Sequence, residues 1–215
     1  MPCTLLPQLV SHHLSKRVSL GNCILWVRKR LLEVSLILVR PHPLLRSMPD
    51  IYELKSLAVA VKTHITSPGA LIGIEGHSTA GKTTLSTAFA AAIGGAAIAT
   101  DNYIDRDSNA NNYADRIQLE KLRLALTESR RSHQAVLIEG ICLRDTLQRL
   151  ELVPQAFIYC KRISQGGLWA DDPENYLDDG SPRSDLSWVD RQSVVYHLLA
   201  RPLENADLVY AWQEP

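Results

Sequence analysis

The run Gly76-His77-Ser78-Thr79-Ala80-Gly81-Lys82-Thr83-Thr84 points most directly to chemistry, because it matches GxxxxGK[ST] in full. In such a loop, backbone N–H groups turn toward phosphate oxygens, and glycine allows the turn and the close approach. Lys82 is placed to reach the β- and γ-phosphates, and the Thr83 hydroxyl suits Mg²⁺, which prefers oxygen ligands. The run therefore predicts a site for a nucleotide and Mg²⁺; the alternative is an incidental glycine-rich turn.

The elements around this loop are those that a phosphate site needs. Residues 70–75 form a short apolar run, which is typical of a buried parallel strand. After the loop, apolar residues recur at helical spacing at Leu85, Ala88, Phe89, Ala92 and Ile93, and Gly94-Gly95 ends the pattern. The helix N-terminus would add partial positive charge to the phosphate site.

The rest of the chain alternates between helix and strand patterns. A first helix is expected to begin after Asp50, as N-cap with Glu53 three residues on, and to stop at Pro68-Gly69. Further strands are expected at 96–100, 135–139, 156–160 and 208–211, and helices at 113–130, 145–150 and 189–200. Residues 164–187 are predicted to be loop. This alternation predicts a parallel sheet with helices on both faces.

Two acids follow predicted strands, so we expect both at the carboxyl edge of the sheet, where open α/β sheets bind ligands. Asp101 closes the second strand and is a candidate base for the proton of an acceptor hydroxyl. Its alternative role is to cap a turn. Glu139 closes the third strand and is a candidate to hold a water on Mg²⁺ or to orient the nucleophile. Its alternative is a plain ion pair.

Several classes of protein are disfavoured. No NKxD tetrapeptide for guanine recognition occurs, and the third strand ends in Glu139-Gly140 rather than in the Asp-Glu pair of ATP-driven motors. With 23 basic and 23 acidic residues, the chain lacks the basic excess of a nucleic-acid binder. Its four cysteines show no CxxC spacing, which argues against a zinc module or a disulfide scaffold and favours the cytoplasm. No apolar run approaches the ~20 residues of a membrane span.

Residues 1–47 differ from the rest and are treated as an extension before a domain at 48–215. They hold seven Lys or Arg and one acid, Glu33, which gives a charge of +6 against −6 for the remainder. Three interpretations stay open. The segment is a mitochondrial-type transit peptide, a basic arm for a partner or a membrane surface, or upstream sequence that is absent if translation starts at Met48.

Several motifs together resemble the uridine kinase and phosphoribulokinase group of P-loop kinases, over about residues 70–211. They are Gly76–Thr84, Thr100-Asp101-Asn102-Tyr103, residues 136–140, and Tyr196 to Pro202 leading into residues 206–209. The resemblance implies a P-loop NTPase fold with a five-stranded parallel sheet in the order 2-3-1-4-5. It also implies transfer of the γ-phosphoryl group of ATP to a hydroxyl of a small metabolite.

The resemblance also implies roles for other residues. In that group the stretch 109–116 lines the acceptor pocket, which makes Asp115 a candidate beside Asp101; alternatively, Asp115 is a helix-start carboxylate. Apart from the resemblance, Tyr103 is a candidate to stack on or hydrogen-bond the acceptor, and its alternative is a place in the core. His77 is a further candidate to touch the acceptor. Uridine kinases carry several arginines in a lid after the fourth strand, whereas this chain offers Lys161-Arg162 and then an acidic, glycine-rich stretch. Arg162 is therefore expected to act alone or with Arg183, Arg191 or Arg201.

The sequence leaves a second class of function open, a regulatory module that binds nucleotide with little transfer. A kinase for a sugar, a vitamin or a nucleotide would share the chemistry and change the acceptor. The acceptor and any homo-oligomer are not readable from these residues.

Overall fold

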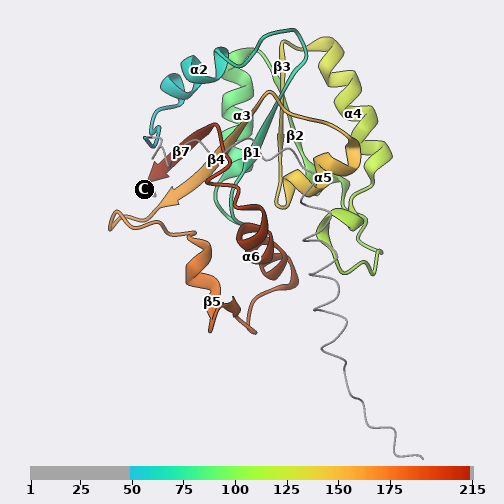
Figure 1. Cartoon of the computed structure of the whole chain (residues 1–215). Coiled ribbons are helices and arrows are strands. Elements are labelled where there is room, and N and C mark those ends of the chain that lie inside the picture. The colour runs from blue at the N-terminus through green and yellow to red at the C-terminus, as the bar shows by residue number, and fades with distance from the viewer. Residues whose placement is uncertain (1–48, 214–215) are drawn as a thin grey trace, which may run out of the picture. The chain divides into compact units, whose positions relative to one another are not determined.

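The computed structural model describes residues 49–213 of the 215-residue chain. The predictions for residues 1–47, and for a domain start at Met48, lie outside these residues. Figure 1 shows the described elements, which run in the order α2 (Leu54–Lys62), β1 (Ala70–Glu75), α3 (Lys82–Ile93), β2 (Ala96–Ala99), α4 (Leu119–Ser132), β3 (Ala135–Glu139), α5 (Leu143–Leu150), β4 (Ala156–Ile163), β5 (Leu177–Asp178), β6 (Ser181–Pro182), α6 (Trp188–Ala200) and β7 (Leu208–Gln213).

The central sheet has five parallel strands in the order β2-β3-β1-β4-β7. β1 lies in the middle, with Ile72 beside Leu137 of β3 on one side and beside Ala156 of β4 on the other. This is the predicted order 2-3-1-4-5, because β7 is the fifth strand of the sheet. All five strands therefore end at one edge, and the loop after β1 lies between the two halves of the sheet.

Side chains alternate between the two faces of the sheet, as the period of a strand requires. Leu71 and Val136 pack with the cluster that includes α4 and α5, whereas Ile72 and Leu137 pack with the cluster that includes α2 and α3. Both faces are thus covered by helices (Figure 1), and for this reason β1 and β3 are buried along their whole length.

Two helix starts differ from the sequence prediction. α2 begins at Leu54 with Glu53 in the N-cap position, and no side chain caps it. Asp50 instead pairs with Lys161 at 3.2 Å, so a long-range ion pair replaces the expected local cap. The helix expected at 113–130 is divided into a 3₁₀ turn, Tyr113–Arg116, and α4, because Ile117 is extended and bridges to Ile104.

The buried face of α3 also differs. Ala88 and Ala92, which were expected inward, are exposed, and Ser86 and Ala90 are buried beside Leu85 and Phe89. A helix of mostly small residues carries a weak periodic signal, so the sequence pattern placed the face incorrectly.

Residues 164–187 are largely irregular, as predicted, but include a 3₁₀ turn, Pro173–Tyr176, and the two-stranded pair β5–β6. We call this range the lid segment. Figure 1 shows it (orange) beside α6 at the end of β4. Between residues 49 and 213, no helix combines the length and the apolar character needed to cross a membrane.

Candidate active site at the carboxyl edge of the sheet

The loop of residues 76–81, which we call the phosphate loop after its sequence motif, connects β1 to α3. Two side chains bind it through the carbonyl oxygen of Ala80. Trp212 Nε1 of β7 donates to the carbonyl oxygen of Ala80 at 2.7 Å, and Cys160 Sγ of β4 donates to the same oxygen at 3.0 Å. Burial raises the pKa of the Cys160 thiol to about 12, so it remains a protonated donor.

Gly81 is a position in this loop where a side chain does not fit. Its φ of 84° lies in the left-handed region, and a Cβ there would lie 2.8 Å from Trp212 Nε1. Thr79 also has a positive φ, 67°, and is exposed at the tip of the loop with Thr84 nearby on the first turn of α3. Ser78 is half-buried. The loop thus adopts the curled conformation that its glycine spacing predicts.

Lys82 begins α3 and lies under the loop. Its side chain is only 7% exposed, and Nζ donates to the carbonyl oxygen of His77 at 2.8 Å. Burial lowers the pKa of Lys82, while the negative charges of Glu139, Asp101 and Asp171 act in the opposite direction. The ammonium group therefore lies within electrostatic range of the carboxylates predicted for this edge of the sheet.

Glu139 and Thr83 are joined directly. Thr83 Oγ1 donates to Glu139 Oε1 at 2.7 Å, although the two residues are 56 positions apart. Glu139 is 2% exposed, and burial raises its pKa, whereas the Thr83 hydrogen bond and the Lys82 charge lower it. This pair supplies two oxygen donors beside the loop.

Gly140 allows the ends of β2 and β3 to approach each other. A Cβ at this position would overlap the hydroxyl oxygen of Thr100, which is fully buried. The close approach brings Asp101, the next residue after Thr100, into the electrostatic environment of Glu139 and Lys82. Asp101 lies in a 3₁₀ turn, Thr100–Tyr103, rather than in the strand itself, and its side chain is exposed.

The remaining predicted residues are less closely grouped. Tyr103 is half-buried against the core cluster that includes α4 and α5. Arg149 Nη2 lies 2.7 Å from the carboxylate of Asp115, so this carboxylate already forms an ion pair. Arg162 lies on β4, and its backbone N–H donates to Asp171 Oδ1 of the lid segment at 3.0 Å.

His77 connects the loop to the lid segment. Its ring is 1% exposed and stacks on Tyr176, with centroids 4.3 Å apart and planes 19° apart. Burial lowers the pKa of His77, and the nearby charges of Asp171 and Asp190 raise it. The side chain of His77 thus packs against the lid segment.

Sequence reasoning missed a buried network directly before the loop. Glu75, 1% exposed, accepts hydrogen bonds from Tyr196 OH of α6 and from Arg144 Nε of α5, the latter at 2.8 Å. Burial raises the pKa of Glu75, and the Arg144 charge lowers it. The network fastens the end of β1 to two helices. Its members are 69 and 121 positions from Glu75, so no local pattern signals it.

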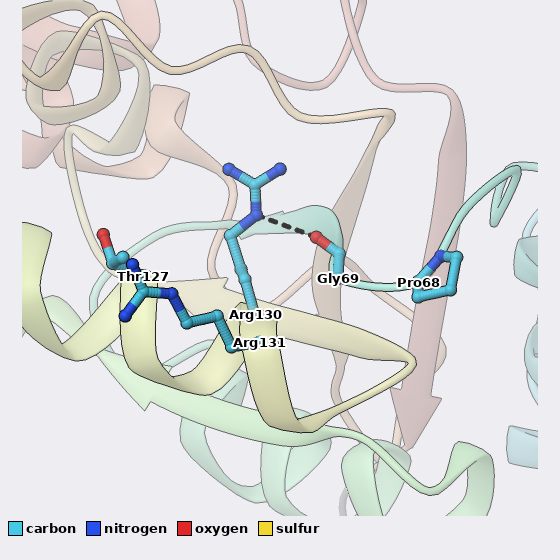
Figure 2. Close-up of a pocket in the computed structure, with 5 residues that line it drawn as sticks. All are labelled: Pro68, Gly69, Thr127, Arg130 and Arg131. Carbon is cyan, nitrogen blue, oxygen red and sulfur yellow. Dashed lines mark hydrogen bonds between the residues drawn. The ribbon is translucent and has the colours of Figure 1, made fainter.

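A surface pocket lies away from this site. It is lined by Pro68, Gly69, Thr127, Arg130 and Arg131, and Arg130 Nε donates to the Gly69 carbonyl at 2.8 Å (Figure 2). Gly69 precedes β1 and the arginines end α4, so the pocket is at the amino edge of the sheet. None of the predicted site residues lines it.

The glycine-rich loop between the central strand and α3, together with the strand order, defines a P-loop NTPase fold. One similar solved structure is described as a possible uridine kinase from Bacillus stearothermophilus. It has a TM-score of 0.47 and 17% identity, over 73% of this chain and 96% of that one. No protein-family model matches the sequence, and no curated protein matches it significantly. Function is therefore inferred from this chain's own residues.

Proposed function

We propose that the chain is an ATP-dependent phosphotransferase that moves the γ-phosphoryl group to a hydroxyl of a small metabolite, in the manner of a uridine kinase. The observation that supports this is the grouping of Lys82, the Thr83–Glu139 pair and the exposed carboxylate of Asp101 at one edge of the sheet. Phosphoryl transfer needs these parts: cations for the phosphates, oxygen ligands for Mg²⁺ and a group that accepts the proton of the nucleophile.

The donor set fits Mg²⁺. Among residues 49–213, no group of three or more His, Cys, Asp or Glu side chains is arranged to hold a metal ion. Mg²⁺ in phosphotransferases, however, is commonly bound by one or two protein oxygens, the nucleotide phosphates and water. The Thr83 hydroxyl and the Glu139 carboxylate would supply those protein oxygens. The ion would neutralise charge on the transferring group.

The loop residues and the acidic residues would have different roles in the reaction. The loop N–H groups of residues 76–84 and Lys82 would bind the phosphates, and Arg162 would add positive charge from β4. Asp101 would accept the proton of the acceptor hydroxyl. Tyr103 and Asp115 follow Asp101 in the chain and would contribute to the wall of the acceptor pocket.

The first experiment incubates the full chain with Mg²⁺-ATP and a pool of nucleosides, pantothenate, ribosyl compounds and sugars. Mass spectrometry then detects the gain of one phosphoryl group. We expect one acceptor class to be phosphorylated, and Lys82→Ala to lower the rate at least about 100-fold while the chain stays folded by circular dichroism. Lys121→Ala, on the exposed face of α4, is the matched control.

Asp101→Asn tests the proton acceptor separately. The amide keeps the shape of the side chain but is not basic, so we expect kcat to fall about 10²–10³-fold with nucleotide affinity unchanged. An equal loss of nucleotide binding and turnover would contradict this role.

A second candidate function is a regulatory module that binds nucleotide without efficient transfer. It is favoured by two of the arginines that were candidates for the lid, because Arg183 pairs with Asp185 at 2.6 Å and Arg201 pairs with Glu204 at 3.0 Å, all on the surface. Tight ATP binding with no product across the whole acceptor pool would support this alternative.

A further inference from the structure

Asp101 has a direct partner that the proposed reaction does not yet use. The hydroxyl of Tyr113, twelve residues later, donates a hydrogen bond to Asp101 Oδ1. The Tyr113 ring is 1% exposed and stacks near Trp188 of α6, with centroids 6.4 Å apart and planes 26° apart. A buried ring therefore presents one polar atom to the candidate base.

The backbone holds this tyrosine in a fixed place. The loop between the two residues is closed by an antiparallel bridge between Ile104 and Ile117, and Gln118 N donates to the Tyr103 carbonyl at 2.8 Å. Asn112 caps the following 3₁₀ turn, since its Oδ1 accepts from Ala114 N at 2.9 Å. Tyr113 opens that turn, so its position relative to Asp101 is set by the closed loop.

The bond has a fixed direction. Burial and the neighbouring Asp101 charge raise the pKa of the Tyr113 hydroxyl, so it stays protonated and acts as the donor. Oδ1 of Asp101 is then occupied. Among the described residues, no hydrogen bond reaches Oδ2, and Asp101 is an exposed residue. One carboxylate oxygen is anchored and the other is left for a ligand.

We propose that Tyr113 is a positioning residue that anchors Asp101 Oδ1 and thereby directs Oδ2 toward the acceptor hydroxyl. This inference rests on the proposed function. In the step, the acceptor oxygen forms a bond to the γ-phosphorus and its proton passes to Oδ2. The bond between the γ-phosphorus and the bridging oxygen breaks, and ADP leaves with that electron pair. Misplacement of the proton acceptor by about 1 Å is enough to slow such a step about 10²-fold.

The test is Tyr113→Phe in the full chain, which keeps the buried ring and removes the hydroxyl. We expect kcat to fall about 10–100-fold while the KM for Mg²⁺-ATP changes less than about twofold. In an Asp101→Asn background, measured in single turnovers, the same change should cost less than about twofold, because the group that it positions is already gone. Tyr52→Phe, on an exposed ring, is the control and should leave kcat unchanged.

Other outcomes would overturn the inference. An unchanged kcat in Tyr113→Phe would mean that the tyrosine has only a structural role. The same would follow if Tyr113→Phe lowered kcat equally in the parent chain and in the Asp101→Asn background. If no acceptor is phosphorylated at all, the proposed function fails. The contact is then judged by urea unfolding of Tyr113→Phe, Asp101→Ala and the double variant. Additive shifts in the midpoint would show that the two side chains do not interact, and non-additive shifts would show that they do.

Discussion

At the scale of single residues, the Thr83–Glu139 pair is the clearest consequence of the sheet order. β3 lies beside β1, so the acid that ends β3 meets the hydroxyl that follows the loop after β1. Glu139→Gln keeps the volume and the acceptor oxygen but removes the charge. We therefore expect the gain in ATP affinity that Mg²⁺ provides to fall about 10–100-fold, while metal-free binding stays the same.

This prediction is checked by calorimetric titration of ATP with Mg²⁺ and again with EDTA. The ratio of the two dissociation constants isolates the metal's share of the binding. Glu120→Gln is the matched control, since that side chain is 86% exposed on α4. A ratio that Glu139→Gln leaves unchanged would remove Glu139 from the metal site.

At the scale of elements, the lid segment is fastened to the phosphate loop by one aromatic stack. An aromatic pair of this geometry contributes about 0.5–1.5 kcal/mol beyond its buried area. Tyr176→Ala removes the stack on His77. We expect residues 164–187 to exchange amide hydrogens about 2–13-fold faster, the factor that this free energy gives, and α4 to exchange at the same rate as before.

Hydrogen exchange with mass spectrometry resolves the two regions in one sample. Leu168→Ala provides the control, because this side chain belongs to the same segment but is 74% exposed. If Tyr176→Ala and Leu168→Ala loosened the segment equally, the stack would not be what holds it.

The elements were predictable where the signal is local. Apolar runs bounded by glycine or polar residues located β1 and β3, and the alternation of strand and helix predicted a parallel sheet. The order of the strands was predicted from the family resemblance. The prediction failed where tertiary contacts outweigh local preference. Asp50 pairs with Lys161 rather than capping a helix, and Ile117 bridges to Ile104 and interrupts the helix expected at 113–130.

The residues of the candidate site were likewise predictable only where the signal is local. The phosphate loop is contiguous in sequence, so its motif located Lys82 and Thr83, and Asp101 and Glu139 followed from the strand ends. Tyr113 was not predicted to contact Asp101, because that contact depends on how a polar loop closes. Glu75 gave no signal either, since its partners come from α5 and α6 and only the packed fold brings them together.

At the scale of the whole molecule, buried histidines make stability depend on pH. His197 of α6 donates through Nδ1 to the Ser193 carbonyl at 2.7 Å, and its ring lies 5.5 Å from His77. Burial, together with the charges of His77 and Lys82, lowers the pKa of His197 to about 4, although the Ser193 hydrogen bond acts in the opposite direction. In the folded protein the His197 ring is therefore neutral, whereas in the unfolded chain the same ring binds a proton near pH 6.5.

The sign follows from this difference. Because the unfolded state binds more protons between pH 6.5 and about 4, the stabilisation is complete above pH 6.5 and is lost as the pH falls toward 4. His197 alone accounts for a loss of about 3 kcal/mol over that range, and His77 acts in the same direction.

Urea unfolding of the full chain at pH 7.5, 6, 5 and 4 measures this slope. His197→Asn retains an amide donor for Ser193 without a proton to gain, so its unfolding free energy should change less with pH than that of the parent chain. His64→Asn, two residues after α2, is the control for the substitution itself. A parallel slope in His197→Asn would show that the acid sensitivity comes from other groups.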